Sequence, residues 1–102
     1  MRTCGSSQKA QAIDLAIVAA QVELFEVKTS ARSTDVYTGV GQLLIHGECI
    51  RELLELPVRR NLVLPELPRA SYAKHVTTVG GINIVTYKKD GRGYTFCGLQ
   101  TQ

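Results

Sequence analysis

Three charged residues border an apolar stretch near the beginning of the chain. Asp14 comes directly before the run LAIVAAQVELFEV, Glu26 is the next-to-last residue of that run, and Lys28 follows it. Acids and lysines are mostly solvent-exposed, so their position at the ends of strand-like segments requires a reason. Carboxylate oxygens suit Mg²⁺ or Mn²⁺, and a fixed lysine stabilises negative charge on phosphoryl oxygens. These residue types therefore predict metal-dependent chemistry on a phosphate.

An antiparallel hairpin would bring the two acids together. The segments 15–19 and 22–27 have the length of strands and are rich in β-branched residues. If residues 19–21 form a three-residue loop, Asp14 lies opposite Glu26. Directly opposite Cβ atoms are about 4.5–5.5 Å apart, where like charges are destabilising unless a cation offsets them. The register therefore predicts a divalent metal ion between Asp14 and Glu26, whose shell a main-chain carbonyl and waters would complete.

Strand alternation places Lys28 beside this site. Glu26 and Lys28 share one face, roughly 6.6–7 Å apart along the strand, while Phe25 and Val27 pack on the other face. Lys28 would then hold the attacking water or offset charge on a metal-bound phosphate. The alternative is that these are solvated surface charges, since a Glu-x-Lys triplet is common by chance.

A long helix is predicted after the hairpin. Ser33, Thr34 or Asp35 would cap it, and Pro57 would stop it. Its apolar positions at helical spacing are Val36, Val40, Leu43, Ile50 and Leu54. Gln42 and His46 are four residues apart and share a face outside this stripe, which could point them toward the metal end of the hairpin. The alternative for His46 is a surface residue without such a role. Glycines 39, 41 and 47 indicate either a close approach to this helix or a break in it.

The order of these features resembles the PD-(D/E)xK nuclease superfamily. A strand opens with Asp, a turn leads to a second strand that ends in Glu-x-Lys, and a helix with a Gln follows. The resemblance covers the chain from Ala12 to about Pro65, and the segment EVKTSARSTDVYTGVGQLLIHG is its most specific part. It implies a restriction-endonuclease-like fold.

The resemblance also implies roles for individual residues. Asp14 and Glu26 would be metal ligands together with the Val27 carbonyl, and Lys28 would be the catalytic lysine. Gln42 would be an active-site or substrate-positioning residue. Tyr37 and His46 are further candidates for nucleic-acid contact. Arg32 joins them because it follows the Glu-x-Lys strand closely and could contact a phosphate.

The rest of the chain predicts further elements of a mixed sheet. Residues 61–64 read as a strand, Pro68 opens a second helix that Gly80 and Gly81 terminate, and 82–87 with 94–97 read as a hairpin around Asp90-Gly91. That turn would pair Tyr87 with Tyr94. The expected fold is α/β, or α+β, with a mixed central sheet flanked by helices and residues 1–102 in a single domain.

Composition limits the functional classes. The chain has 102 residues, is 44% hydrophobic and carries a net charge of +3, which fits a DNA partner without requiring one. The later basic residues are candidates for phosphate contacts, or else solvated loop charges. They are Arg59, Arg60, Lys88, Lys89 and Arg92. Three cysteines without metal-ligand spacing and a polar start predict a reduced, cytoplasmic protein that does not enter a membrane.

The main interpretation is a nuclease that uses Mg²⁺ or Mn²⁺, and two alternatives to it stay open. The first is a catalytically inert nuclease-fold module that binds nucleic acid or a protein, because only a dozen residues precede Asp14 and leave little room for the helix usual in the superfamily. The second is an unrelated α+β domain whose acids are surface residues. A domain this small would gain DNA-binding surface as a homodimer, since specific interfaces bury about 1,000 Å² or more.

Overall fold

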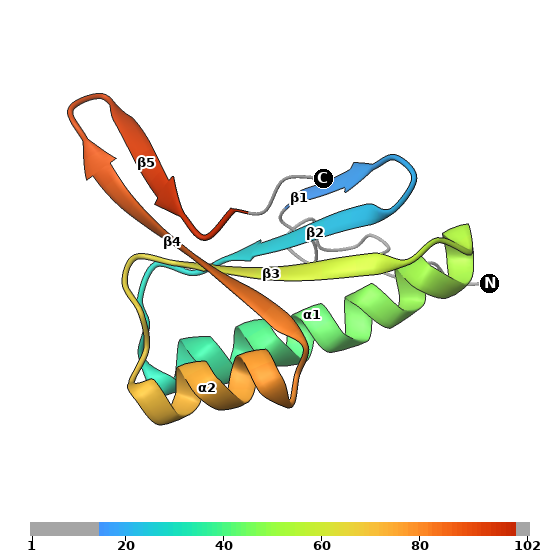
Figure 1. The fold of residues 1–102 in the computed structure, drawn as a ribbon, viewed down its shortest axis with the longest axis horizontal. Coiled ribbons are helices and arrows are strands. Elements are labelled where there is room, and N and C mark those ends of the chain that lie inside the picture. Colours follow the sequence, from blue (N-terminus) through green and yellow to red (C-terminus); the bar gives the residue numbers. More distant parts are fainter. Residues whose placement is uncertain (1–14, 100–102) are drawn as a thin grey trace.

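The computed structural model describes residues 15–99 and shows an α/β fold. Five strands form a mixed, curled sheet and two helices pack against it (Figure 1). The elements, in chain order, are β1 (Leu15–Val18), β2 (Val22–Val27), α1 (Ser33–Leu54), β3 (Val58–Leu64), α2 (Ala70–Thr78), β4 (Ile82–Asp90) and β5 (Gly93–Cys97).

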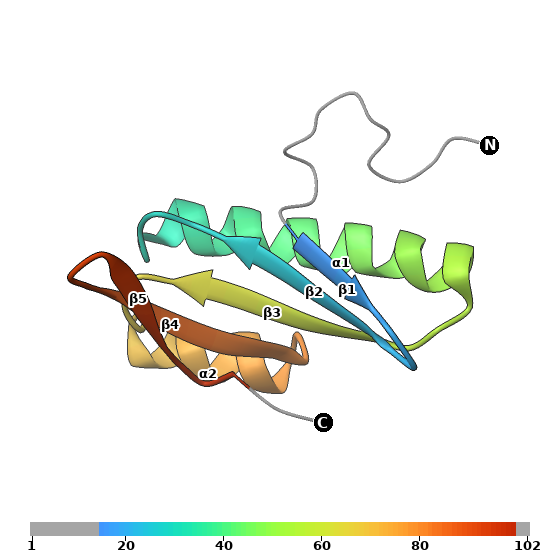
Figure 2. The same cartoon turned by 90° about the horizontal axis from the view of Figure 1, so that it is seen from above.

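The strands lie in the sheet in the order in which they occur in the chain. β2, β3 and β4 are parallel, and β1 and β5 add an antiparallel strand at each edge. Both parallel connections run through a helix and extend the sheet in the same direction. Crossovers of one hand then place both helices on the same face (Figure 2). The predicted mixed sheet with helices packed against it is confirmed, and both helices lie on the same face.

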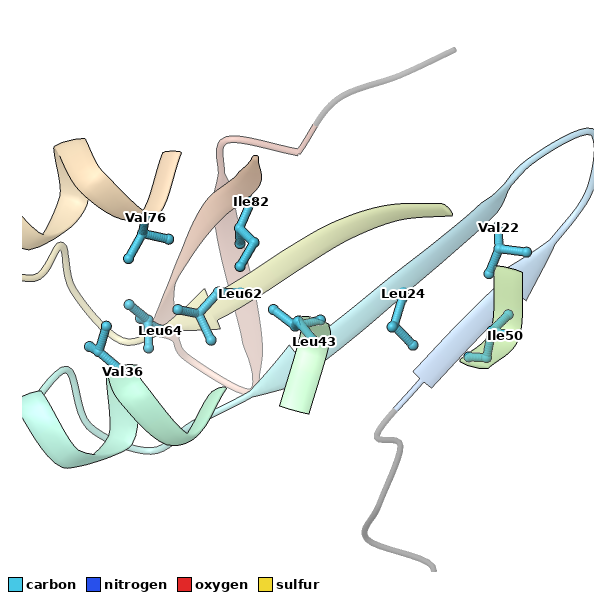
Figure 3. Close-up of a cluster of buried hydrophobic side chains, with 9 residues drawn as sticks. All are labelled: Val22, Leu24, Val36, Leu43, Ile50, Leu62, Leu64, Val76 and Ile82. Atoms are coloured by element: carbon cyan, nitrogen blue, oxygen red, sulfur yellow. The ribbon is translucent and has the colours of Figure 1, made fainter. Parts of the chain in front are cut away.

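The hydrophobic core lies between this face and the two helices (Figure 3). β2 shows why: its buried residues alternate along the strand, so Val22 and Leu24 point to the helix side. Leu43, at the middle of α1, is completely buried against them. The cluster consists of Val22, Leu24, Val36, Leu43, Ile50, Leu62, Leu64, Val76 and Ile82.

Two glycines let α1 approach the sheet closely. A Cβ atom at Gly39 would lie 2.5 Å from Cδ1 of Leu62, and one at Gly47 would collide with the Arg60 guanidinium. Gly41, on the other side of the helix, has open space around it. The helix is continuous from Ser33 to Leu54, so the alternative of a break is wrong.

The first hairpin has the predicted register. Leu15 pairs with Phe25 and Val18 with Val22, which leaves residues 19–21 as the loop. The cap of α1 differs from the prediction. Its N-cap residue is Arg32, which makes no side-chain capping hydrogen bond, while the Ser30 hydroxyl donates to Asp35 in the first turn.

The third strand begins three residues earlier than the sequence suggests. Arg59 and Arg60, expected just before the strand, lie inside β3, where their side chains alternate between the two faces. Arg59 forms an ion pair of 3.3 Å with Glu23. Arg60 donates from Nε to the Leu43 carbonyl over 2.9 Å. Both arginines therefore have structural partners instead of being solvated loop charges.

The register of the second hairpin corrects the prediction. Tyr87 pairs with Phe96 and Asp90 with Gly93, so the turn is formed by Gly91 and Arg92. Gly91 has φ +64°, a conformation that glycine adopts readily and that the first central position of a type II′ turn requires. The shift moves one strand by two residues and keeps every side chain on its predicted face. Tyr87 and Tyr94 still touch, diagonally, with ring centroids 5.9 Å apart.

Candidate active site at the end of strand β2

Glu26 and Lys28 lie together at the carboxyl end of β2. Both side chains point to the helix-covered side of the sheet, as predicted from alternation, and Lys28 Nζ is 3.8 Å from Glu26 Oε2. Glu26 is only 4% exposed. A carboxylate this deeply buried needs a charged or hydrogen-bonding partner, and the Lys28 ammonium is one such partner.

The backbone around Lys28 is fixed from the neighbouring strands. The Lys28 N–H donates to the Val63 carbonyl over 2.9 Å, and the Tyr87 hydroxyl donates to the Lys28 carbonyl over 3.1 Å. Both contacts come from the β3 and β4 side. Successive carbonyls of a strand point to opposite edges. The Val27 carbonyl therefore points toward the β1 side of the sheet, where its predicted role as a metal ligand would place it.

Gln42 lies on α1, the helix that the Lys28 side chain passes. Lys28 Cε is 3.5 Å from the position of a Cβ at Gly39, and Gln42 follows three residues later, partly buried. Its Oε1 is buried and has no hydrogen-bond partner among residues 15–99. A buried amide oxygen without a partner is costly, so this atom is suited to accept a hydrogen bond or to contact a cation.

His46 is one helical turn beyond Gln42 on the same flank and is half-buried. His46 lies further from the carboxyl end of β2 than Gln42 does, because α1 begins at that end, and its role in nucleic-acid binding stays a prediction.

Arg32 and Tyr37 belong to a separate group of side chains. Tyr37 is 61% exposed and packs on Tyr72 of α2, with ring centroids 5.6 Å apart. Arg32, Arg69 and Tyr72 help to line a pocket of about 440 Å³ between the starts of the two helices. Hydrogen bonds with Ser33 and Tyr37 lower the pKa of Tyr72, whereas the bond with Tyr72 raises the pKa of Tyr37. The two predicted nucleic-acid residues thus lie toward α2, on the opposite flank of α1 from Gln42.

Asp14 lies outside the described residues. The described register of β1 and β2 ends with the pair Leu15 and Phe25, so the pairing of Asp14 with Glu26 stays a prediction. Within residues 15–99 no three His, Cys, Asp or Glu residues form a cluster that could hold a metal ion. The ligands that the sequence predicts among the described residues are oxygens, the Glu26 carboxylate and the Val27 carbonyl, and the buried Gln42 Oε1 is a further oxygen donor. Such a set fits a hard cation such as Mg²⁺ or Mn²⁺.

Sequence reasoning missed the part that Tyr87 plays. It assigned this tyrosine only to a cross-strand pair, but its hydroxyl holds the backbone of Lys28 from 59 residues away in the chain. No local pattern carries that signal, because the contact depends on β4 lying two strands from β2.

A scan against protein-family models gives no match, and comparisons with curated proteins and with solved structures give none either. None of the helices between residues 15 and 99 is both long and apolar enough to span a membrane.

Proposed function

We propose that this protein is a metal-dependent nuclease, or a nuclease-like DNA-processing protein, that hydrolyses phosphodiester bonds. The observation that supports the proposal is the pairing of Glu26 and Lys28 at the end of β2, beside α1, whose Gln42 has a buried Oε1 without a hydrogen-bond partner among residues 15–99. The same three residues carry the resemblance to the PD-(D/E)xK superfamily, which makes a restriction-endonuclease-like core the matching proposal for the fold.

Each residue has a distinct task in this proposal. Glu26, the Val27 carbonyl and Asp14 would hold Mg²⁺ or Mn²⁺. The bound cation would polarise the scissile phosphate and lower the pKa of a coordinated water. Lys28, whose backbone is fixed by Val63 and Tyr87, places its ammonium toward the phosphate and offsets charge that develops on its oxygens. Gln42 accepts a hydrogen bond from the attacking water through its buried Oε1.

The DNA would approach along the carboxyl edge of the parallel strands. α1 and α2 both begin at this edge, and helix N-termini favour phosphate. Arg32 is exposed at the first of them, and Arg69 at the second lies over the Tyr72 ring at 5.5 Å. Tyr37 borders this path near the start of α1, where it would contact the sugar-phosphate backbone. His46 is about 20 Å further along the helix from its start at Ser33 and lies off this path.

Calorimetric titration with Mn²⁺ tests the metal site directly. Wild type and a Glu48→Gln control should bind Mn²⁺, because Glu48 is an exposed acid elsewhere on α1. Glu26→Gln and Asp14→Asn should lose that binding, since each removes a charged ligand and leaves a similar shape. Equal binding by wild type and Glu26→Gln would refute the site.

A cleavage assay tests the chemistry. Lys28→Ala should lose cleavage of DNA in Mg²⁺ or Mn²⁺ while keeping the fold, which circular dichroism and thermal unfolding would check. Cleavage that Lys28→Ala leaves unchanged would remove Lys28 from the mechanism.

The burial of Glu26 favours a second candidate, an inert module with the same fold. With 4% exposure and Lys28 beside it, this carboxylate is partly neutralised without a metal ion. Such a module would bind nucleic acid or a protein partner. It predicts no Mn²⁺ binding heat, no cleavage by wild type, and unchanged ligand binding in Glu26→Gln.

A further inference from the structure

The face of the sheet that the helices leave uncovered carries an aromatic pocket. Its volume is about 240 Å³, and it is lined by Val27, Val63, Tyr87, Tyr94 and Phe96. None of these five side chains is charged. Tyr94 is 57% exposed and Phe96 48% exposed, and both lie on the edge strand β5. Exposed aromatic residues gathered in this way on a small protein are typical of a binding surface.

The size and shape of the pocket indicate a single planar ring system. Pockets for drug-sized ligands measure roughly 300–1,000 Å³, so this one is smaller. The Tyr87 and Tyr94 rings meet at an angle of 76°, which provides one aromatic face and one edge around the space. Every nucleobase has a π-face that can stack on such side chains.

The charges beside the pocket favour a polyanion. Lys89 pairs with Tyr94 across the β4–β5 hairpin, so strand alternation puts it on the same face as the pocket. Arg92 is in the turn of this hairpin, which projects away from the two helices (Figure 1). A second copy of the chain docked symmetrically here would bring two basic hairpins together, which like-charge repulsion disfavours.

We propose that this aromatic pocket binds an unpaired base of single-stranded DNA. For its cleavage step, this inference rests on the nuclease proposed above. The substrate of that nuclease is then single-stranded DNA or DNA that contains an unpaired nucleotide. A fully paired duplex keeps its bases inside the helix and cannot fill the pocket.

The pocket is connected to the candidate active site through two contacts. Val27, which lines it, stands between Glu26 and Lys28 in β2 and faces the opposite side of the sheet. Tyr87, which also lines it, donates its hydroxyl to the Lys28 carbonyl. A strand passing over the carboxyl end of β2 would place a base on the open face and a phosphate near the Lys28 ammonium.

Fluorescence anisotropy with a labelled single strand and the matched duplex tests the proposal. The titrations use the full chain in Ca²⁺, a larger cation whose looser coordination suits binding without turnover. Wild type should bind the single strand more tightly than the duplex. A Tyr94→Ala/Phe96→Ala variant should bind the single strand at least about fivefold more weakly, since the stacking of one base on aromatic side chains contributes a factor of roughly five or more.

Two variants serve as controls. Ile17→Ala truncates another half-exposed apolar residue on the same face of the sheet, away from the pocket, and should bind like wild type. Leu53→Ala truncates a half-exposed apolar residue of α1, on the other side of the sheet from the pocket, and should also keep single-strand binding. Because this readout does not need cleavage, an inactive wild type that binds as described refutes the nuclease and leaves the pocket standing.

Three results would overturn the inference. The first is that the Tyr94→Ala/Phe96→Ala variant binds the single strand as tightly as wild type does. The second is that wild type binds the duplex more tightly than the single strand. The third is that the double variant differs from wild type only in losing self-association in a sedimentation experiment. The last result would identify a second copy as the occupant. Both substitutions are on an exposed edge strand, and thermal unfolding checks that the variant folds.

Discussion

Replacing Gly39 and Gly41 separately with alanine tests how closely α1 packs on the sheet. The two glycines are two residues apart in the same helix, so alanine at either position gains about 1 kcal/mol of helix propensity. At Gly41 nothing lies within 4 Å of the new Cβ. At Gly39 the new Cβ would be 2.5 Å from Cδ1 of Leu62, which is completely buried and cannot move aside freely.

The difference between the two variants isolates the steric cost, because the propensity gain cancels. Overpacking a core costs about 1–3 kcal/mol. We therefore expect Gly41→Ala to be about 1 kcal/mol more stable than wild type. Gly39→Ala should be about 1–3 kcal/mol less stable than Gly41→Ala, which corresponds to at least about 4 °C in Tm for a chain of this size.

Urea unfolding of both variants measures these free energies. In a Leu62→Val background, which removes the opposing Cδ1, the extra cost of Gly39→Ala should shrink, and the two sites should show a coupling energy. If Gly39→Ala and Gly41→Ala are equally stable, α1 does not lie against Leu62 as the structure shows, and the placement of Lys28 against Gly39 fails with it.

Two further changes test polar contacts. Asn61→Ala should cost about 1–3 kcal/mol in urea unfolding, because the buried amide donates to Glu23 and the Leu24 carbonyl and accepts from Asn83; a neutral result would show that these bonds are absent. The hydrogen bond from Arg51 lowers the pKa of the Glu48 carboxyl, so its small contribution to stability is present above the usual glutamate pKa and is lost as the pH falls. An NMR titration should show this lowered pKa of Glu48 in wild type and a pKa closer to the usual glutamate value in Arg51→Ala. The same Glu48 pKa in both proteins would show that the ion pair does not form.

The first hairpin was predictable because its signal is local. Two apolar strands separated by three residues fix both the loop and the register, and the pairing of Leu15 with Phe25 is the one predicted. The common face of Glu26 and Lys28 follows from strand alternation alone. Neither inference needs to know where the rest of the chain lies.

The errors arose where tertiary contacts decide. Arg59 and Arg60 look like loop charges in sequence, but an acid on β2 and a carbonyl of α1 satisfy them inside β3. The β4–β5 turn was placed one residue too early because Asp-Gly is a strong turn signal, whereas Gly91 occupies the first central position instead of the second. The prediction did not assign the helices to a face of the sheet, because that placement depends on the direction in which each crossover extends the sheet.

The one-sided helix layer gives β2 an unusual position in the molecule. Its last residues alternate between a covered face, where Glu26 and Lys28 meet α1, and an open face, where Val27 lines the aromatic pocket. Tyr87 joins the two sides, since its ring belongs to the pocket and its hydroxyl holds the Lys28 backbone. A ligand that moves this ring would therefore act on the backbone of the proposed catalytic lysine, so the proposed base binding on one face and the proposed chemistry on the other would be coupled through a single strand.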